Sequence, residues 1–579
     1  MTHRSETILR SLLSSALIAV AIGSPSLALA QAITPGAADV GRVEDRVQGQ
    51  TQVPASTPDI QVRKAGATVA PAGSENVHFT LSSISFEGAT VYSPAQLETE
   101  YANRIGTEIS LADLYGIAAQ ITAKYRNDGY ILTQIVVPPQ TIEGGVARLQ
   151  VVEGTIGNIT VEGDATKEAN ALPLMRRYAA GIKKDGGPLN VADLERALLL
   201  INDLPGVSAR SVISPSPTTV GAADLAIVVT RSPFEGLVGI DNFGSRYLGK
   251  WEGTAAGVIN SQIFGYNERV TGQVVYAPHG GLFDRELAYG SVAYWAPIGS
   301  LGTGVEALYS YTNTKPGLDL RALDVLGKSQ YASLTVQHPF IRTRGLNLTG
   351  RALFDARSTT TENNIPDERE DHIRALRIGG RLEFIDSLFS GGANTMDLEL
   401  AKGLNIFGAS DEDSSRLTRP DGNPQFFKVE GTLERLQHLT SHFNILLGVK
   451  GQYTNSALLS SEEFGVGGSG YGRGYDPSEI TGDDGFAAKV EVQWNTPLKS
   501  EWFTSPQVFG FYDAGRVWNE DATTSGDKIN SLASAGLGLR TDVVGSFKTE
   551  VYLARPLTEE VGTENDTDSR FYLNVSRRF

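Results

Sequence analysis

Two short motifs in the last quarter of the 579-residue chain carry residue types that can form a charged contact inside a protein. One places an arginine between glycines in the polar, glycine-rich stretch 461–484, and the other places an aspartate on a strand-like segment. Arginine presents a planar fork of donors that matches a carboxylate, so such a pair can hold a loop firmly where bulk water is excluded. The alternative is a solvated loop arginine and a separate wall aspartate that never meet. The motifs are Gly472, Arg473, Gly474 and Tyr475, and Phe511, Asp513 and Gly515.

Most enzyme chemistries lack their residues in this chain. There is no cysteine, and only His438 and His442 of the seven histidines lie at i,i+4 spacing, without a suitably placed acid. The glycine pattern at 465–470 lacks the strand–turn–helix context of a dinucleotide site, and neither a Walker A sequence nor a Gly-x-Ser-x-Gly elbow occurs. A net charge of −16 disfavours phosphate backbones as partners. We expect no catalytic, cofactor-binding or metal-binding residues and no nucleic-acid partner.

Residues 1–30 have the pattern of a secretory signal peptide. Basic Arg4 and Arg10 precede a short apolar stretch from Leu12 to Ile22, and Ala28-Leu29-Ala30 supplies a small-x-small cleavage site. The apolar stretch is shorter than the roughly 20 residues that a transmembrane helix needs. Cleavage after Ala30 would leave Gln31 as the new N-terminus, so the mature chain is expected outside the cytoplasm.

The next two segments are predicted to be a short helix and a linker. Residues 31–50 form a polar helix whose thin apolar stripe cannot stabilise it alone in water, so the helix needs a surface to dock against. Residues 51–76 are rich in Pro, Ala, Thr, Ser and Gly, which is typical of a flexible linker.

Residues 77–154 and 155–232 repeat one order of elements: strand, two helices, two strands. In the first copy, Ser93 with Gln96 and Ser110 with Asp113 have the spacing of helix-capping boxes. In the second copy, Asn190 opens the corresponding long helix. Each copy is predicted to be a small α+β module with one covered sheet face and a sheet edge free for an extended guest strand.

From about residue 233 to the end, segments of about ten residues alternate between apolar and polar side chains. This pattern favours a transmembrane β-barrel, with apolar side chains toward lipid and polar side chains toward an aqueous lumen. A β-sandwich is the alternative, but the segment is long for one sandwich, and the leader and terminal Phe579, a predicted assembly signal, favour the membrane. At about 9–11 residues a strand, residues 233–579 accommodate sixteen strands. Examples of the apolar face are Phe486, Ala488, Val490, Val492 and Trp494.

Counting strands backward from Phe579 places the two motifs. If the last strand ends on the periplasmic side, Asp513 lies on the fourth strand from the end and residues 461–484 form an outer loop. This loop can fold back into the lumen, where Arg473 can pair with Asp513.

The whole chain after the leader resembles the transporter subunit of two-partner secretion systems, the haemolysin and filamentous-haemagglutinin secretion/activation proteins. The phrases "YRNDGYILTQIVVPPQ" and "GGVARLQVVEG" are similar to the family's first POTRA domain, and "GLGLR" and "VYLARPL" to its late barrel strands. Arg473-Gly474-Tyr475 matches its loop motif, although Gly472 replaces the usual branched apolar residue. Phe511, Asp513 and Gly515 match its strand motif, and in the family the two motifs meet.

The resemblance implies a mainly β fold: a 16-stranded antiparallel transmembrane barrel preceded by two POTRA domains, at 77–154 and 155–232, and an N-terminal plug helix. It implies a non-enzymatic outer-membrane pore, with its N-terminal domains in the periplasm, that secretes a large TpsA-type exoprotein without nucleotide hydrolysis. Outer-membrane lipids and, during biogenesis, the barrel-assembly machinery are the other expected partners. An assembly or insertion factor of the same superfamily is the alternative function, although such factors usually carry three or more POTRA units. A diffusion porin would carry none.

Overall fold

The computed structural model describes most of the chain after the predicted leader. The leader and the cleavage site between Ala30 and Gln31 lie outside the described residues. The described residues are 35–48, 59–62, 69–163, 171–182, 186–219, 221–364, 368–498, 500–520, 528–543 and 547–579.

The first α+β unit packs one long helix against a three-stranded sheet of order β3-β6-β5. The Ser110 hydroxyl caps this helix by accepting from the Asp113 amide, and the Ser110 amide donates to the Asp113 carboxylate, as the capping-box spacing predicts. The helix buries Leu114, Ile121 and Tyr125 against the sheet. The elements are β2 (His78–Thr80), β3 (Ser83–Glu87), α2 (Pro94–Glu98), β4 (Glu108–Ser110), α3 (Leu111–Asn127), β5 (Gln134–Val136) and β6 (Val146–Val152).

The second α+β unit has the same plan and carries one additional strand. Its sheet has the order β1-β8-β9-β7, in which β1 (Asp59–Val62) comes from the segment predicted to be a linker. Strand β1 lies parallel to β8, with Ile60 opposite Ser211. The prediction that this segment is only a flexible linker is therefore wrong for residues 59–62, and the β8 edge, predicted to be free, is occupied. The other elements are β7 (Thr155–Glu162), α5 (Leu172–Ala180), α6 (Val191–Asn202), β8 (Val207–Pro215) and β9 (Ala222–Arg231).

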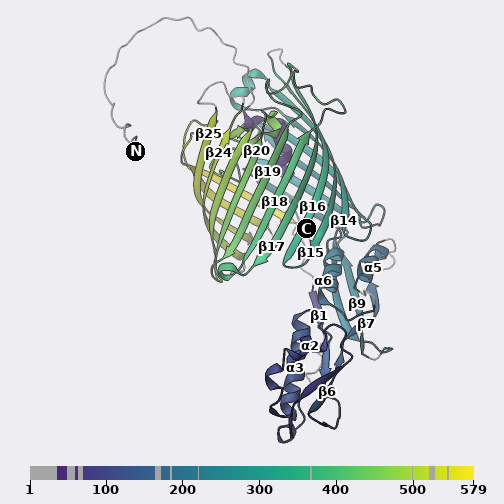
Figure 1. Cartoon of the computed structure of the whole chain (residues 1–579). Helices are drawn as coiled ribbons and strands as arrows, with labels where there is room; N and C mark the ends of the chain where they lie inside the picture. Colours follow the sequence, from purple (N-terminus) through teal and green to yellow (C-terminus); the bar gives the residue numbers. More distant parts are fainter. Residues whose placement is uncertain are drawn as a thin grey trace, which may run out of the picture. The chain divides into compact units, whose positions relative to one another are not determined.

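Sixteen antiparallel strands then form a closed barrel, as the strand-length estimate predicted (Figure 1). The last strand pairs with the first, so each barrel strand has two partners and no open edge faces lipid. The strands are β10 (Phe234–Asp241), β11 (Glu252–Asn260), β12 (Arg269–His279), β13 (Gly281–Ile298), β14 (Thr303–Thr314), β15 (Leu326–Arg342), β16 (Leu346–Glu362), β17 (Arg369–Asp386), β18 (Gly392–Gly403), β19 (Phe427–His438), β20 (Phe443–Thr454), β23 (Asp484–Asn495), β24 (Phe503–Trp518), β25 (Ile529–Val543), β26 (Phe547–Pro556) and β27 (Arg570–Arg578).

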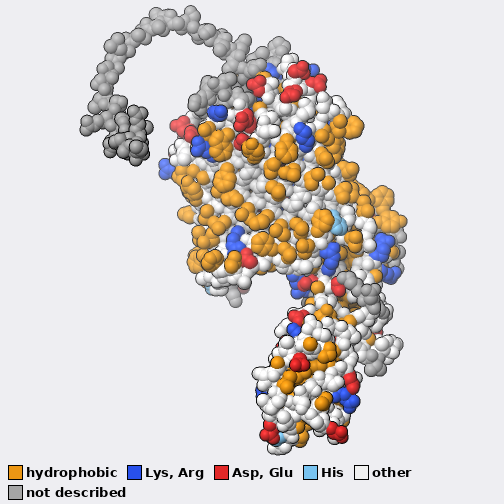
Figure 2. All heavy atoms as spheres, in the orientation of Figure 1, with side chains coloured by type: hydrophobic (Ala, Val, Ile, Leu, Met, Phe, Trp, Pro, Cys, Tyr) orange, Lys and Arg blue, Asp and Glu red, His pale blue; other side chains and the backbone are white. Residues whose placement is uncertain are grey.

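The alternation in the sequence corresponds to the two faces of the barrel wall. On β23, Val490 and Trp494 are exposed on the outside, whereas Glu491 is buried on the inside. Hydrophobic side chains cover much of the outer wall in the view of Figure 2. This arrangement suits a wall with lipid on one side and an aqueous lumen on the other. Separately, no helix in the described ranges is long and apolar enough to cross a membrane.

The described part of the predicted N-terminal helix, residues 35–48, begins more tightly wound than an α-helix, and residues 31–34 and 49–50 lie outside the described residues. Two 3₁₀ turns, η1 (Gly36–Ala38) and η2 (Val40–Arg42), precede the single α-helix α1 (Val43–Gln48). Asp39 accepts a hydrogen bond from the Gly41 amide and opens the second turn. We call residues 35–48 the plug, because they contact inward-facing residues of the barrel wall (described below).

The strand counting places the arginine and aspartate motifs correctly in the barrel. Asp513 lies on β24, the fourth barrel strand from the end, and the segment 455–483 connects β20 to β23. This segment contains the 3₁₀ turn η7 (Ser460–Glu462) and a small hairpin of β21 (Phe464–Val466) and β22 (Ile480–Gly482). We call residues 455–483 the long loop.

Candidate functional site

The long loop turns into the barrel and brings the two motifs into contact. The Arg473 guanidinium donates from Nη2 to Asp513 Oδ1 at 2.8 Å and from Nε to Asp513 Oδ2 at 2.9 Å. The Arg473 amide also donates to Asp513 Oδ2, at 3.1 Å. Arg473 is 5% exposed and Asp513 0% exposed. The contact is therefore a two-point, charge-assisted pair shielded from bulk water.

A second carboxylate contacts the same guanidinium. Arg473 Nη1 forms an ion pair with Glu491 on β23, and Glu491 also pairs with Arg540 of β25. Arg540 in turn lies 3.2 Å from Glu550 of β26. Burial alone would lower the pKa of Arg473, but the hydrogen bonds and charges of Asp513 and Glu491 raise this pKa above its ordinary value. A chain of alternating charges thus joins the loop tip to four neighbouring strands.

Sequence reasoning missed Glu491 and Arg540 as members of this site. The dyad alternation does place Glu491 on the inner face, between Lys489 and Gln493. The sequence does not show the register of β23 with β24. This register sets Glu491 directly opposite Phe511, two residues from Asp513. The register of neighbouring strands depends on the whole barrel and is not a local property.

The remaining strand-motif residues make room for the loop arginine. The Arg473 guanidinium carbon lies 3.6 Å from the ring centroid of Phe511, a cation–π contact. At Gly515, a Cβ would lie 2.5 Å from a methyl group of Val466 in the β21 hairpin. The aromatic ring and the absent side chain therefore shape the wall beneath the loop.

The loop-motif residues fit the wall in the same way. Tyr475, 1% exposed, donates its hydroxyl toward the carbonyl oxygens of Ala533 and Glu559, at 3.2 and 3.1 Å. At Gly474, a Cβ would lie 2.9 Å from the Ser534 Cβ, so only glycine allows this approach. Gly472 has φ +100°, a conformation that branched residues rarely adopt. The sequence departure at Gly472 thus corresponds to a left-handed turn in this chain.

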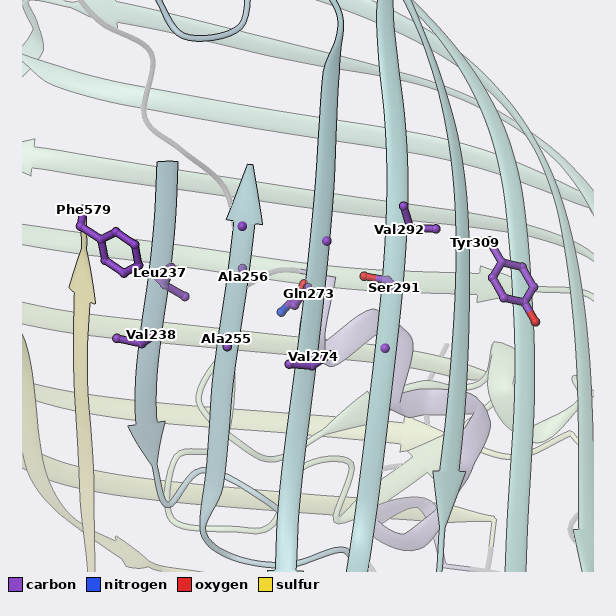
Figure 3. A pocket seen from close by; sticks show the side chains of 13 residues that line it. Leu237, Val238, Ala255, Ala256, Gln273, Val274, Ser291, Val292, Tyr309 and Phe579 are labelled. Atoms are coloured by element: carbon purple, nitrogen blue, oxygen red, sulfur yellow. The ribbon is translucent and has the colours of Figure 1, made fainter. Parts of the chain in front are cut away.

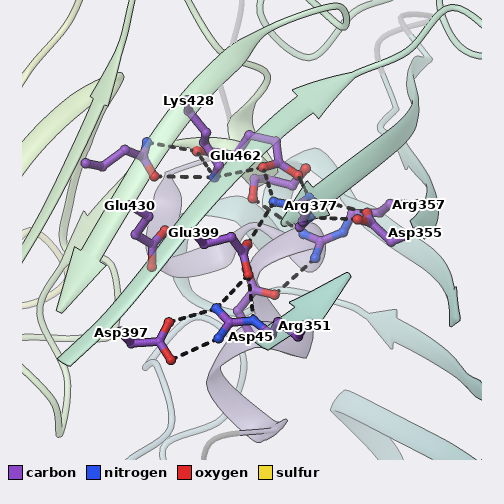
Figure 4. Close-up of polar contacts among 12 residues, drawn as sticks. Asp45, Arg351, Asp355, Arg357, Arg377, Asp397, Glu399, Lys428, Glu430 and Glu462 are labelled. Atoms are coloured by element: carbon purple, nitrogen blue, oxygen red, sulfur yellow. Dashed lines mark hydrogen bonds and ion pairs between the residues drawn. The ribbon is translucent and has the colours of Figure 1, made fainter. Parts of the chain in front are cut away.

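A second acidic residue anchors the start of the long loop. Glu462 lies 2.7 Å from Arg377 of β17 and 2.8 Å from Lys428 of β19 (Figure 4). Arg377 also pairs with Asp355 of β16 at 2.7 Å. The loop is therefore held by ion pairs at several places, which also include Arg246 with Asp476 and Arg419 with Asp483.

Charged contacts join the plug to the lumen wall. Arg46 makes a two-point contact with Glu252 of β11, each bond 2.7 Å long, and Asp45 lies 3.1 Å from Arg357 of β16. Glu44 accepts a hydrogen bond from the Tyr289 hydroxyl at 3.1 Å. Breaking a charged contact and returning its groups to water costs less free energy than exposing buried apolar surface, because water solvates the separated ions.

The plug also makes an apolar contact with residues of the barrel. The four residues of the predicted apolar stripe, Ala38, Val40, Val43 and Val47, are all buried. Three of them, Ala38, Val43 and Val47, belong to a buried cluster that includes Val275 and Leu287. The inside of the barrel therefore provides the docking surface that this weakly apolar segment needs.

The plug also contacts the long loop directly. Arg42 donates to the Ser460 carbonyl oxygen at 2.8 Å and to the Ser478 hydroxyl at 3.1 Å. A Cβ at Gly41 would lie 2.8 Å from the Ser461 Cβ. The two elements that fill the lumen thus pack against each other as well as against the wall.

The histidines and acids of the described ranges form no evident metal site. No group of three or more His, Cys, Asp or Glu side chains in these ranges is arranged to hold a metal ion. His438 instead contacts Asn444 Oδ1 at 2.9 Å at the end of β19.

Comparisons with known protein families match most of this architecture. Residues 221–541 match the family model of haemolysin secretion/activation protein ShlB/FhaC/HecB, and residues 79–154 match the ShlB-type POTRA domain. The heme/hemopexin transporter protein HuxB of Haemophilus influenzae (strain 86-028NP) is 26% identical over 487 residues, which cover 82% of this chain and 83% of that protein. The outer membrane transporter CdiB of Escherichia coli O6:K15:H31 is 24% identical over 509 residues, which cover 83% of each.

Solved structures show the same fold. CdiB from Escherichia coli superposes with a TM-score of 0.68 at 21% identity, covering 89% of this chain and 94% of that chain. BamA from Haemophilus ducreyi lacking POTRA domains 1-3 superposes with a TM-score of 0.53 at 15% identity, covering 86% of this chain and 100% of that chain.

We predict that Arg473→Ala releases the loop tip without unfolding the barrel. Removing one partner of a buried ion pair costs about 3–5 kcal/mol, enough to shift the docked loop toward the free state by roughly two to four orders of magnitude. The readout is maleimide labelling of a cysteine introduced at Ser534, which the loop covers and which would be the only thiol in the chain. Asp513→Ala should release the tip less, because Arg473 keeps Glu491.

The control for this comparison is Arg516→Ala, an exposed arginine on the same strand that contacts Trp518. Heat-modifiable gel mobility checks that each barrel is folded. Equal labelling rates in Arg473→Ala and the parent would show that the ion pair does not hold the loop.

Deleting residues 33–50 should raise single-channel conductance in planar bilayers, because the plug occupies the lumen through a few separable contacts. Arg46→Ala alone should raise the frequency of openings, since Glu252 loses its two-point partner. Arg148→Ala, which removes an exposed pair with Glu87 in the first α+β unit, serves as the matched control. Unchanged conductance after the deletion would mean that another element closes the pore.

Proposed function

The chain belongs to the haemolysin secretion/activation protein ShlB/FhaC/HecB family, and from this premise we propose that it exports one large TpsA-type exoprotein through its lumen. As a member of this family it is an outer-membrane two-partner secretion transporter, not an enzyme. The observation that carries the proposal is the closure of the lumen. The plug and the long loop occupy the lumen and form ion pairs with its wall. The chain segment that follows the plug contains β1, which pairs with the β8 edge of the second α+β unit.

The periplasmic units are the proposed site of partner capture, and we assign residues 77–154 and 155–232 as two POTRA domains. An extended partner segment can add to an open sheet edge, where backbone hydrogen bonds supply affinity and side-chain pockets supply specificity. In the first unit, β3 and β5 are the edge strands. In the second unit, β1 demonstrates that the β8 edge accepts a parallel strand.

Strand β1 suggests how capture is linked to opening. It follows the plug by a short segment, from Gln48 to Asp59, so the plug and the occupied edge are tethered to each other. If a strand of the partner displaces β1 from β8, the segment between the plug and β1 is released. The plug is then no longer tethered near its contacts with the barrel wall. Partner binding in the periplasm and plug release then favour each other by linkage.

Transport needs no nucleotide in this proposal. The exoprotein enters the lumen unfolded and folds after it leaves the outer side. A domain that folds there gains about 5–15 kcal/mol and no longer fits the pore, so backward movement is prevented. Some curated relatives are named as heme/hemopexin and haemolysin transporters, which agrees with an exoprotein of the adhesin or haemolysin type as the partner here.

Three further roles concern the long loop, the leader and the C-terminal residue. We propose that Arg473 and Asp513 lock the long loop at rest, that Ala30–Gln31 is the leader cleavage site, and that terminal Phe579 is read by the barrel-assembly machinery. Phe579 is exposed at the end of the last strand, where its backbone exchanges two hydrogen bonds with Gly236 of the first strand.

The capture step predicts that the full-length transporter binds the N-terminal domain of its exoprotein weakly and that freeing the β8 edge strengthens binding. Ile60→Pro should weaken the β1–β8 pairing by about 1 kcal/mol, which corresponds to roughly fivefold tighter partner binding. Calorimetric titration at several salt concentrations measures the affinity. The matched control is Val69→Pro, in the coil between β1 and the first unit.

Two results would contradict this step. Absence of binding at high protein concentration would move recognition from the POTRA domains to the barrel. Equal affinity for Ile60→Pro and the parent would show that the partner does not use the β8 edge.

A further inference from the structure

The outer wall beside the barrel seam has a trough floored by small residues. Gly236 of β10 lies opposite Gly257 of β11, which lies opposite Gly272 of β12, so three glycines form one row across three strands. Larger apolar side chains stand at the sides of this row, including Val274 and Phe579 (Figure 3). The hollow has a volume of about 620 Å³, the size range of small-molecule sites.

The barrel itself does not require glycine at two of these positions. A Cβ at Gly257 or Gly272 would meet no atom within 4 Å, and both residues lie in regular extended strands. Glycine weakens a strand interior and commonly marks a place where a ligand approaches the backbone closely. The open space on the outside therefore points to an external group that lies on this floor.

A positively charged residue borders the trough on the lipid-facing side. Arg577 of β27 is exposed and pairs in register with Val238, which lines the trough. Its guanidinium lies 5.3 Å from the ring centroid of Phe547. Within the described ranges it forms no ion pair. A charge on the lipid face of a barrel is unfavourable unless it reaches the interface or an anion.

The trough lies in the periplasmic half of the wall. Gly257 and Gly272 are each three residues from the turn that joins β11 to β12, about 10 Å along the strands. Arg577 and Phe579 end the last strand at the same rim. Both the apolar floor and the cation therefore face the inner leaflet of the outer membrane.

We propose that this trough is a binding site for an inner-leaflet phospholipid. One acyl chain lies on the floor of Gly257 and Gly272, and the lipid phosphate pairs with Arg577. The bound lipid bridges the first and last strands of the barrel, β10 and β27, on their outer face. The inference rests on the membrane location of the barrel and does not depend on the identity or capture of a partner exoprotein.

Lipid titration of the full-length protein, followed by native mass spectrometry, tests this site with dioleoyl-phosphatidylglycerol as the probe. Gly257→Leu should weaken the tightest binding step roughly tenfold, because its side chain occupies the floor. Arg577→Gln should weaken it about fivefold through loss of the charge, with the trough intact. Gly431→Leu, on the outer face of β19 away from the seam, is the matched control and should bind as the parent does.

Two further arms identify what is bound. Dioleoylglycerol, which lacks the phosphate, should bind the parent about as weakly as phosphatidylglycerol binds Arg577→Gln, and inorganic phosphate should not compete. Heat-modifiable mobility confirms that every variant is folded. Parent-like lipid binding in Gly257→Leu or in Arg577→Gln, an equal loss in Gly431→Leu, or a lipid-free dimer that Gly257→Leu dissolves would overturn the proposal.

Discussion

The buried Arg473 guanidinium, held between carboxylates of two adjacent strands, is the interaction on which the closed lumen depends. A charge removed from water is tolerated only when it is paired and hydrogen-bonded, and Asp513 and Glu491 together supply that compensation. The wall that carries these carboxylates is rigid because every barrel strand is paired on both sides. The loop can therefore change position without loss of the barrel.

The plug follows the same physical logic at lower strength. Its charged fixed points are Arg46 on Glu252 and Asp45 on Arg357, and its apolar residues pack in a buried cluster beside them. Such contacts hold the plug in the pore at rest, and water replaces them when the plug leaves. Opening the pore therefore does not require a large unfavourable free-energy step. Because Arg42 binds the long loop, movement of either element alters the surface that the other packs against.

Much of this architecture could be predicted from the sequence, because the membrane imposes a period of two on every strand. The barrel, its strand number and the position of Asp513 follow from that alternation and from counting back from Phe579. The capping pairs of the α+β units are equally local. The meeting of Arg473 with Asp513 needed the additional support of family resemblance.

What could not be predicted depends on contacts between distant segments. The roles of Glu491 and Arg540 follow from strand register, which the motifs do not encode. Strand β1 was missed because its polar, proline-rich surroundings are typical of a linker, and only the β8 edge makes residues 59–62 extended. The first half of the plug is 3₁₀ and the second half is α-helical, a division that the weak helical stripe in the sequence does not indicate.

The central claim is that plug and loop must separate for the pore to open, and the cysteine-free chain allows a direct measurement. Cysteines at Gly41 and Ser461 would have their Cβ atoms close enough for a disulfide after a small adjustment. The account predicts that the oxidised double variant exports no exoprotein into the medium and that reduction restores export, with either single cysteine variant as control. Equal export by the oxidised and reduced forms would contradict it.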